Sequence, residues 1–117
     1  MTFEIGNTMV GLVRGREAKL IATGAGPPER VDGYAVGVAS SLGPPHSEMH
    51  PDGDEVLILI SGRLTVTLEE PTGSRSVELL PGQGLIVPQG MWHEVVAEEA
   101  CQLVHATPGP GGEHRPL

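Results

Sequence analysis

Residues His50 to Glu55 read HPDGDE and place a histidine and a glutamate on either side of a turn in an otherwise apolar β pattern. The two residues are five positions apart, so one uninterrupted strand would send their side chains to opposite faces. Pro51, Asp52 and Gly53 favour a turn, and a turn can return both side chains to one face. An imidazole and a carboxylate that converge are ligands for a borderline divalent metal ion. The alternative is a solvated hairpin tip whose acidic residues keep the loop in water.

A second segment, residues 82–93, favours the metal site because it delivers another histidine, His93, after a Pro-x-Gly turn. The two segments together resemble the cupin family, whose motifs run G-x5-H-x-H-x3,4-E-x6-G and G-x5-P-x-G-x2-H-x3-N. In the first motif, His50 falls on the second histidine, Glu55 on the glutamate and Gly62 on the closing glycine. In the second motif, the matching residues are Gly82, Pro88, Gly90 and His93.

Two departures of the chain from the family pattern bear on the site. Glu48 stands where the first motif has its first histidine, and Ala97 stands where the second motif ends in asparagine. The usual set of three histidines and one glutamate is therefore replaced, and the resemblance implies metal ligation by Glu48, His50, Glu55 and His93.

His46 is the rival for the position of Glu48, because it has the same strand parity. It lies about 6.6 Å further along the strand, at ~3.3 Å per residue, and needs a bulge or kink after Pro44-Pro45 to reach the site. Glu48 shares a strand face with His50 and needs no such distortion. Register therefore favours Glu48.

The ligand set leaves one or two positions open on a six-coordinate ion, which is typical of a catalytic rather than a closed structural site. Mn, Fe, Ni, Co and Zn all accept such ligands, so the ion is not specified. The resemblance implies a metal-dependent enzyme of dioxygenase, isomerase or lyase type, whose metal coordinates an oxygen of a small-molecule substrate. Candidate catalytic residues for moving a proton are His46, His105 and, if it is not a ligand, Glu48.

Two alternatives to an enzyme stay open. One is a non-enzymatic small-ligand-binding or sensor protein that uses the interior as a pocket. The other is a degenerate cupin in which Glu48 has abolished tight metal binding and only the fold remains. Stoichiometric metal would favour the enzyme over both.

Composition and charge exclude several classes of protein. The formal net charge of −8 argues against nucleic acid and against anionic membrane surfaces as partners. Cys101 is the single cysteine, so no internal disulfide can form. There is no apolar run of about 18 residues and no signal-peptide pattern at the start. We therefore expect a cytoplasmic protein whose partner is a small-molecule ligand or substrate.

The chain of 117 residues has 17 glycines and 11 prolines, which indicates short strands separated by many turns. The apolar run Val56–Ile60 is typical of a strand that is buried on both faces. The even spacing of strands and turns predicts a β-sandwich or barrel. The resemblance implies an all-β fold of the cupin-type jelly-roll β-barrel, or double-stranded β-helix.

We expect a single cupin domain over residues 1–106, with N-terminal strands in residues 1–33 and the motif-bearing barrel at about 34–106. The weakly patterned N-terminal residues could supply an exchanged edge strand, and we expect a homodimer. Residues 107–117 are rich in proline and glycine and predict a disordered tail, in which His114 would be inert.

Three further residues receive structural interpretations. Local Asx turns, in which a carboxylate binds the backbone just after it, explain Asp52 and Asp54. Tyr34 is expected to fill the core rather than to project into a pocket.

Overall fold

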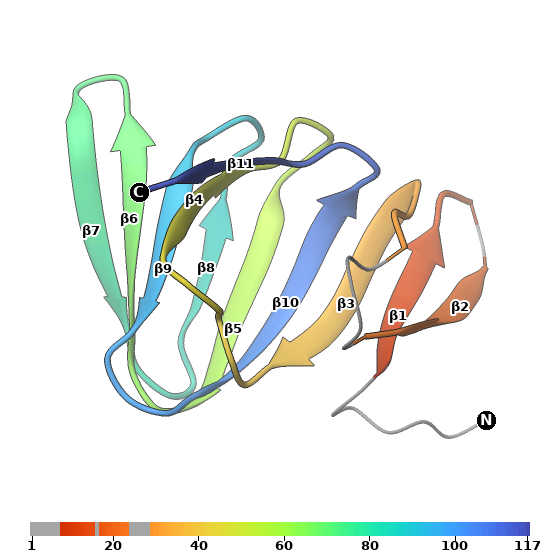
Figure 1. Ribbon diagram of the computed structural model, residues 1–117, viewed down its shortest axis with the longest axis horizontal. Helices are drawn as coiled ribbons and strands as arrows, with labels where there is room; N and C mark the ends of the chain where they lie inside the picture. The colour runs from red at the N-terminus through yellow and green to blue at the C-terminus, as the bar shows by residue number, and fades with distance from the viewer. Residues whose placement is uncertain (1–7, 16, 24–28) are drawn as a thin grey trace.

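The computed structural model describes residues 8–15, 17–23 and 29–117. Within these ranges the chain forms β-strands throughout (Figure 1). Their bounds are β1 Thr8–Val13, β2 Ala18–Ala22, β3 Gly33–Ala39, β4 His46–Met49, β5 Glu55–Ser61, β6 Leu64–Glu70, β7 Gly73–Leu79, β8 Gly84–Val87, β9 His93–Ala97, β10 Gln102–Gly109 and β11 Glu113–Pro116. A search of the same residues finds no helix long and apolar enough to cross a lipid bilayer.

The strands form two antiparallel sheets that face each other. One sheet has the order β2-β1-β3-β10-β5-β8, and the other has the order β11-β4-β9-β6-β7. From β4 to β11 the chain passes repeatedly between the two sheets, as strands of a jelly roll do. The expected all-β jelly-roll fold is therefore confirmed. Among the described residues no backbone pairing joins the two sheets, so they form a two-layered sandwich rather than a closed barrel.

The core lies between the sheets and is built from aliphatic side chains. On β5, Leu57 and Leu59 point inward, and on β6 the inward residues are Leu64, Val66 and Leu68. Each set occupies alternate positions, because successive side chains of a strand point to opposite faces. Leu59, Leu64 and Val66 have no exposed surface.

The apolar run in β5 differs from its prediction. Ile58 is 40% exposed and Ile60 is 54% exposed, so the run is buried on one face only. Ile86 on the neighbouring strand β8 is 63% exposed. In the described part of the chain no second layer covers this outer face of the sheet. An exposed apolar face of this kind is typical of a protein–protein contact.

The expectation of a disordered tail from residue 107 is wrong. Residues Thr107 to Gly109 continue β10 and pair with β3, and β11 pairs with β4 in the register that places His114 opposite Glu48. Proline and glycine in this segment oppose a packed core. They do not prevent the segment from forming backbone hydrogen bonds with the edge of an existing strand. β4 offers such an edge, and β11 covers it (Figure 1).

The predicted N-terminal strands are present as β1 and β2. They form a hairpin that joins the larger sheet through the pairing of β1 with β3. Residues 1–7, which belong to the proposed exchangeable arm, and the glycine- and proline-rich residues 24–28 lie outside the described residues.

A pair of neighbours on β5 tests this core assignment. We expect Leu59→Ala to lower the free energy of unfolding by about 2–5 kcal/mol, because it opens a cavity in a fully buried site. Ile60→Ala on the exposed face is the matched control and should change it by less than about 1 kcal/mol. Urea unfolding followed by circular dichroism measures both. Equal losses for the two variants would contradict the assignment.

Candidate metal centre

The turn between β4 and β5 brings His50 and Glu55 back to one face, as the turn-forming residues between them predict. Both side chains point between the sheets, where His50 is 7% exposed and Glu55 is 3% exposed. His50 Nε2 lies 3.3 Å from Glu55 Oε2. His50 and Glu55 are therefore not part of a solvated hairpin tip, although the turn between them is exposed.

The acidic residues of this turn bind backbone groups that are distant in the sequence. Asp52 Oδ2 accepts a hydrogen bond from the Gly111 amide at 2.6 Å, and Asp54 Oδ1 accepts one from the Gln89 amide at 2.8 Å. The Tyr34 hydroxyl donates to the carbonyl of Asp54 at 2.8 Å, so this phenol anchors a loop. The local Asx turns that we expected do not account for Asp52 and Asp54, because both carboxylates tie separate loops together.

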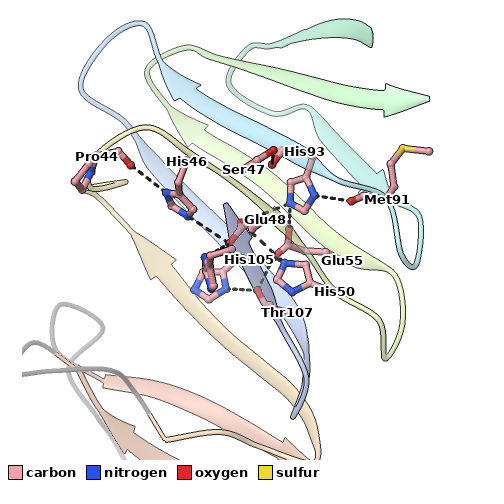
Figure 2. Close-up of polar contacts among 11 residues, drawn as sticks. Pro44, His46, Ser47, Glu48, His50, Glu55, Met91, His93, His105 and Thr107 are labelled. Atoms are coloured by element: carbon pink, nitrogen blue, oxygen red, sulfur yellow. Dashed lines mark hydrogen bonds and ion pairs between the residues drawn. The ribbon is translucent and has the colours of Figure 1, made fainter. Parts of the chain in front are cut away.

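Four side chains converge between the sheets (Figure 2). Glu48 comes from β4, His50 from the following turn, Glu55 from β5 and His93 from β9. One donor atom from each lies within 4.8 Å of the other three. The structure thus brings together the four residues that the motif spacing singled out.

Glu55 is the carboxylate at the centre of the contacts. Its Oε1 lies 3.0 Å from His93 Nε2, and its Oε2 lies 3.3 Å from His50 Nε2. Glu48 Oε1 lies 3.5 Å from His93 Nε2 and 3.9 Å from His50 Nε2. Each imidazole therefore faces both carboxylates.

A backbone carbonyl fixes the orientation of His93. The Nδ1 atom lies 3.0 Å from the carbonyl oxygen of Met91, which can only accept, so Nδ1 carries a proton and Nε2 faces the carboxylates. A hydrogen bond from the second ring nitrogen to a carbonyl oxygen is typical of histidines that bind metal ions.

The mutual contacts shift the ionisation of the cluster. Burial by itself raises the pKa of Glu55, but the His50 and His93 imidazoles and the Thr107 hydroxyl outweigh it and lower the pKa to about 2. Burial lowers the pKa of His93, but Glu48, Glu55 and the Met91 carbonyl raise it to about 10. Burial also opposes ionisation of Glu48, and the His93 contact leaves its pKa below the usual value. Without a metal ion, a proton on His93 balances part of the negative charge.

Sequence reasoning missed Thr107. Its hydroxyl donates to Glu55 Oε2 at 2.6 Å, and its oxygen lies 2.8 Å from His105 Nδ1. Because the hydroxyl proton goes to Glu55, Nδ1 of His105 must be the donor in the second contact. The available signal was parity: Thr107 is two residues after His105 and therefore on the same face of β10.

His46 is not one of the four converging residues. Its Nδ1 lies 3.0 Å from the Pro44 carbonyl, and its Nε2 lies 3.7 Å from Glu48 Oε2, on the side away from the cluster. His105 reaches the cluster only through Thr107. His114, expected to be inert, lies with its Nδ1 3.9 Å from Glu48 Oε2.

Two cavities meet at Glu48. One of about 230 Å³ is lined by aliphatic residues and by polar residues that include His46, Glu55 and His105. Another of about 280 Å³ lies on the side of His50, His114 and the Gly109–Gly112 turn. The cluster is thus accessible from cavities large enough for small molecules.

The donor set fits a divalent transition-metal ion. His50 Nε2 is buried and has no hydrogen-bond partner among the described residues, since its approach to Glu55 lacks hydrogen-bond geometry. A buried polar atom without a partner is costly, and a metal ion would satisfy its lone pair. Two carboxylates and two imidazoles are ligands that Mn, Fe, Ni, Co and Zn accept.

Comparison with protein families gives a match to the model described as the cupin domain, over residues 37–107. The match covers more than half of the chain and includes all four converging residues. The chain belongs to the cupin family. A comparison with curated proteins gives no match.

Solved cupin structures share the fold at low sequence identity. A cupin-2 domain containing protein from Shewanella frigidimarina is 23% identical, with a TM-score of 0.55 over 69% of this chain and 76% of that one. An oxalate oxidase in complex with the substrate analogue glycolate is 21% identical, with a TM-score of 0.52 over 69% of this chain and 45% of that one. Hydroxypropylphosphonic acid epoxidase from S. wedmorenis, in complex with fosfomycin, is 12% identical, with a TM-score of 0.54 over 77% of this chain and 50% of that one.

The ionisation of this cupin site predicts how the stability of the metal-free protein depends on pH. The raised pKa of His93 stabilises the fold fully below about pH 6.5, and this contribution is lost as the pH rises towards 10. The lowered pKa of Glu55 stabilises the fold above about pH 4.5, and this contribution is lost as the pH falls towards 2. We therefore expect chelator-treated protein to melt at its highest temperature between about pH 4.5 and 6.5.

Differential scanning fluorimetry over a pH series measures this dependence. His93→Gln is the control, because it should remove most of the decline on the alkaline side. A melting temperature that stays constant from pH 6.5 to about 9 in the unchanged protein would refute the coupling between His93 and the carboxylates.

Proposed function

We propose that this cupin is a metal-dependent enzyme that acts on a small molecule, with a divalent ion held by Glu48, His50, Glu55 and His93. The observation that supports it best is the buried, unpartnered Nε2 of His50, which faces two carboxylates and a second imidazole. A purely structural cluster would leave this nitrogen unsatisfied. The metal could be Mn, Fe, Ni, Co or Zn.

When bound, such an ion polarises a substrate oxygen and stabilises the charge that develops on it. Dioxygenases, isomerases and lyases all use this effect, and these are the reaction types that we propose. The fold similarity to an oxalate oxidase and an epoxidase supports an enzyme by analogy. It does not select the reaction, because one fold hosts many reactions.

The cavity beside His105 restricts the size of the proposed substrate. Its volume of about 230 Å³ is below the 300–1,000 Å³ of most ligand pockets, which favours a compound of few non-hydrogen atoms. Leu42, Leu57 and Leu103 line its wall, whereas Glu48 and Glu55 border it on the side of the cluster. A molecule with an apolar part and an oxygen-bearing end matches this arrangement.

His105 is the best-placed residue to accept a proton from a molecule in this cavity. Its Nδ1 donates to Thr107, so the lone pair is on Nε2, and the ring lines the cavity. Burial lowers the pKa of His105 despite the nearby carboxylates, so the ring is neutral at pH 7. Of the three proposed catalytic residues, Glu48 would serve as a ligand. His105 is linked to the buried carboxylate Glu55 through Thr107, whereas His46 contacts Glu48.

Binding of a single equivalent of metal tests the proposed ligand set. Chelator-treated protein should bind one added equivalent of Co²⁺, with an absorption spectrum typical of nitrogen and oxygen ligands. His93→Ala should weaken this binding at least about 100-fold, because it removes a ligand from a buried site. A variant that binds the first equivalent as tightly as the unchanged protein would rule out the site.

Turnover separates an enzyme from a binding protein. Metal-loaded protein is incubated with a panel of small hydroxy and oxo acids, and the products are identified by mass spectrometry. We expect His105→Gln to retain the metal and to lose about 10²–10⁴-fold in rate, the usual contribution of general acid–base catalysis. Tight binding of panel compounds without any turnover would support the small-ligand-binding alternative.

The Thr107 hydroxyl offers a second test of the metal site. Thr107→Val keeps the shape of the side chain but removes the hydrogen bond to Glu55, so we expect metal affinity to fall about 10-fold. The matched control is Thr65→Val, which removes an exposed threonine–glutamate hydrogen bond to Glu98 far from the cluster. Competition with a chromophoric chelator measures both affinities, and equal affinities for the two variants would refute a role of Thr107.

A further inference from the structure

Glu48 is the middle residue of a row that crosses three strands. In the smaller sheet, β4 pairs with β9 on one side and with β11 on the other. The registers place Glu48 opposite His93 on β9 and opposite His114 on β11. Directly opposed residues of neighbouring strands share one face, with Cβ atoms about 4.5–5.5 Å apart. The row therefore presents a carboxylate between two imidazoles.

The two oxygens of Glu48 face different partners. Oε1 lies 3.5 Å from His93 Nε2 and 3.9 Å from His50 Nε2, within the four-residue cluster. Oε2 lies 3.7 Å from His46 Nε2 and 3.9 Å from His114 Nδ1. Figure 2 shows Glu48 between His46 and His93. One oxygen of Glu48 therefore faces His50 and His93, and the other faces His46 and His114.

We propose that His46, Glu48 and His114 form a second, outer cation site for a borderline divalent ion such as Zn²⁺, Ni²⁺, Cu²⁺ or Co²⁺. Their donor atoms all lie within 4.8 Å of one another. Two imidazoles and one carboxylate are ligands suited to these ions. If the four-residue cluster, the inner site, also holds an ion, Glu48 would contact both ions, and this part of the proposal rests on the proposed function. The outer site itself does not rest on the proposed function.

The orientation of His46 supports a ligand role. Its Nδ1 lies 3.0 Å from the carbonyl oxygen of Pro44, which fixes the Nδ1–H tautomer and leaves a lone pair on Nε2. That lone pair is on the nitrogen that faces Glu48 Oε2. The rings of His46 and His114 are 5.2 Å apart between centroids and inclined by 38°. Metal-binding histidines commonly have a carbonyl partner of this kind on the second nitrogen.

Geometry and exposure set the strength of the outer site. Ligands ~2.0–2.1 Å from a tetrahedral ion are about 3.3 Å apart, so the observed 3.7 and 3.9 Å must shorten slightly. The His46 and His114 side chains are 37% and 61% exposed, so they can make this movement. Greater exposure also means weaker binding than at the buried cluster. The formal net charge of −8 favours uptake of a second cation.

An ion in the outer site would fasten the C-terminal strand. All four residues of β11 are exposed, and among the described strands β11 pairs with β4 alone. A bond from His114 through the ion to His46 and Glu48 would join β11 to β4 by more than backbone hydrogen bonds. Opening of β11 should therefore become rarer when the outer site fills.

Metal stoichiometry tests the outer site. Equilibrium dialysis of the full chain against Co²⁺, followed by elemental analysis, should give about two ions per chain, the weaker one filling last. His114→Gln and His46→Gln should each reduce this to about one ion and retain the tighter one. Glu113→Gln, which removes a carboxylate next to His114 on the same strand, is the matched control and should bind two.

The same experiment separates failure of the outer site from failure of the inner site. One ion per chain that His93→Ala weakens and His114→Gln leaves unchanged would overturn the outer site and spare the proposed function. One ion that is lost in His114→Gln and unchanged in His93→Ala would overturn the proposed function and spare the outer site.

Amide hydrogen exchange gives a readout that does not depend on counting ions. The second equivalent of Co²⁺ should slow amide exchange in residues 113–115 at least several-fold in the unchanged protein and in Glu113→Gln. The slowing should be absent in His114→Gln. Equal slowing in His114→Gln would show that β11 responds to metal without His114 and would overturn the proposal.

Discussion

The burial of the Glu55 carboxylate is the constraint on which the rest of this structure depends. A carboxylate that is 3% exposed is stable only if its charge and its lone pairs are matched by neighbours. Here one oxygen faces His93, and the other faces His50 and the Thr107 hydroxyl. These partners come from β9, from the turn after β4, and from β10, so the two sheets must meet at this point for the carboxylate to be satisfied. The leucine-rich core supplies the energy of association, whereas Glu55 fixes how the sheets are placed around the cluster.

The loops at this end of the sandwich hold the cluster in position through backbone contacts. Asp52 binds the amide of Gly111, and Asp54 binds the amide of Gln89. The amide of Gly90 in turn donates to the carbonyl of His50 at 2.9 Å. The turn that carries His50 is therefore tied to the loop before β9 and to the turn before β11. Because charged acceptors make the stronger hydrogen bonds, the two exposed aspartates help to hold the turn that carries the buried imidazole.

Much of the site could be predicted from local spacing, because a turn between His50 and Glu55 and the shared parity of Glu48 and His50 leave few arrangements. The contact of Thr107 with Glu55 and that of His114 with Glu48 could not be predicted from local spacing. They depend on the registers of β10 and β11 against strands far away in the sequence, and no local pattern fixes a register across such a separation. The apolar run of β5 shows a related limit. Hydrophobicity indicated burial on both faces, but Ile58 and Ile60 are exposed in the described chain, since apolar residues alone do not reveal whether a second layer is present.

A glutamate at position 48, where the motif resemblance implies a histidine, would change more than the charge of the site. A histidine that binds a metal ion uses one nitrogen, and its other nitrogen usually donates a hydrogen bond to a carboxylate, a carbonyl or water. A carboxylate has two oxygens of equal chemistry, so it can serve two neighbours at once. At Glu48 the two oxygens do face two groups, His50 and His93 on one side and His46 and His114 on the other. Glu48 thereby connects the buried cluster to the edge strand β11. The acidic residue and the ordered C-terminal strand therefore form one structural feature.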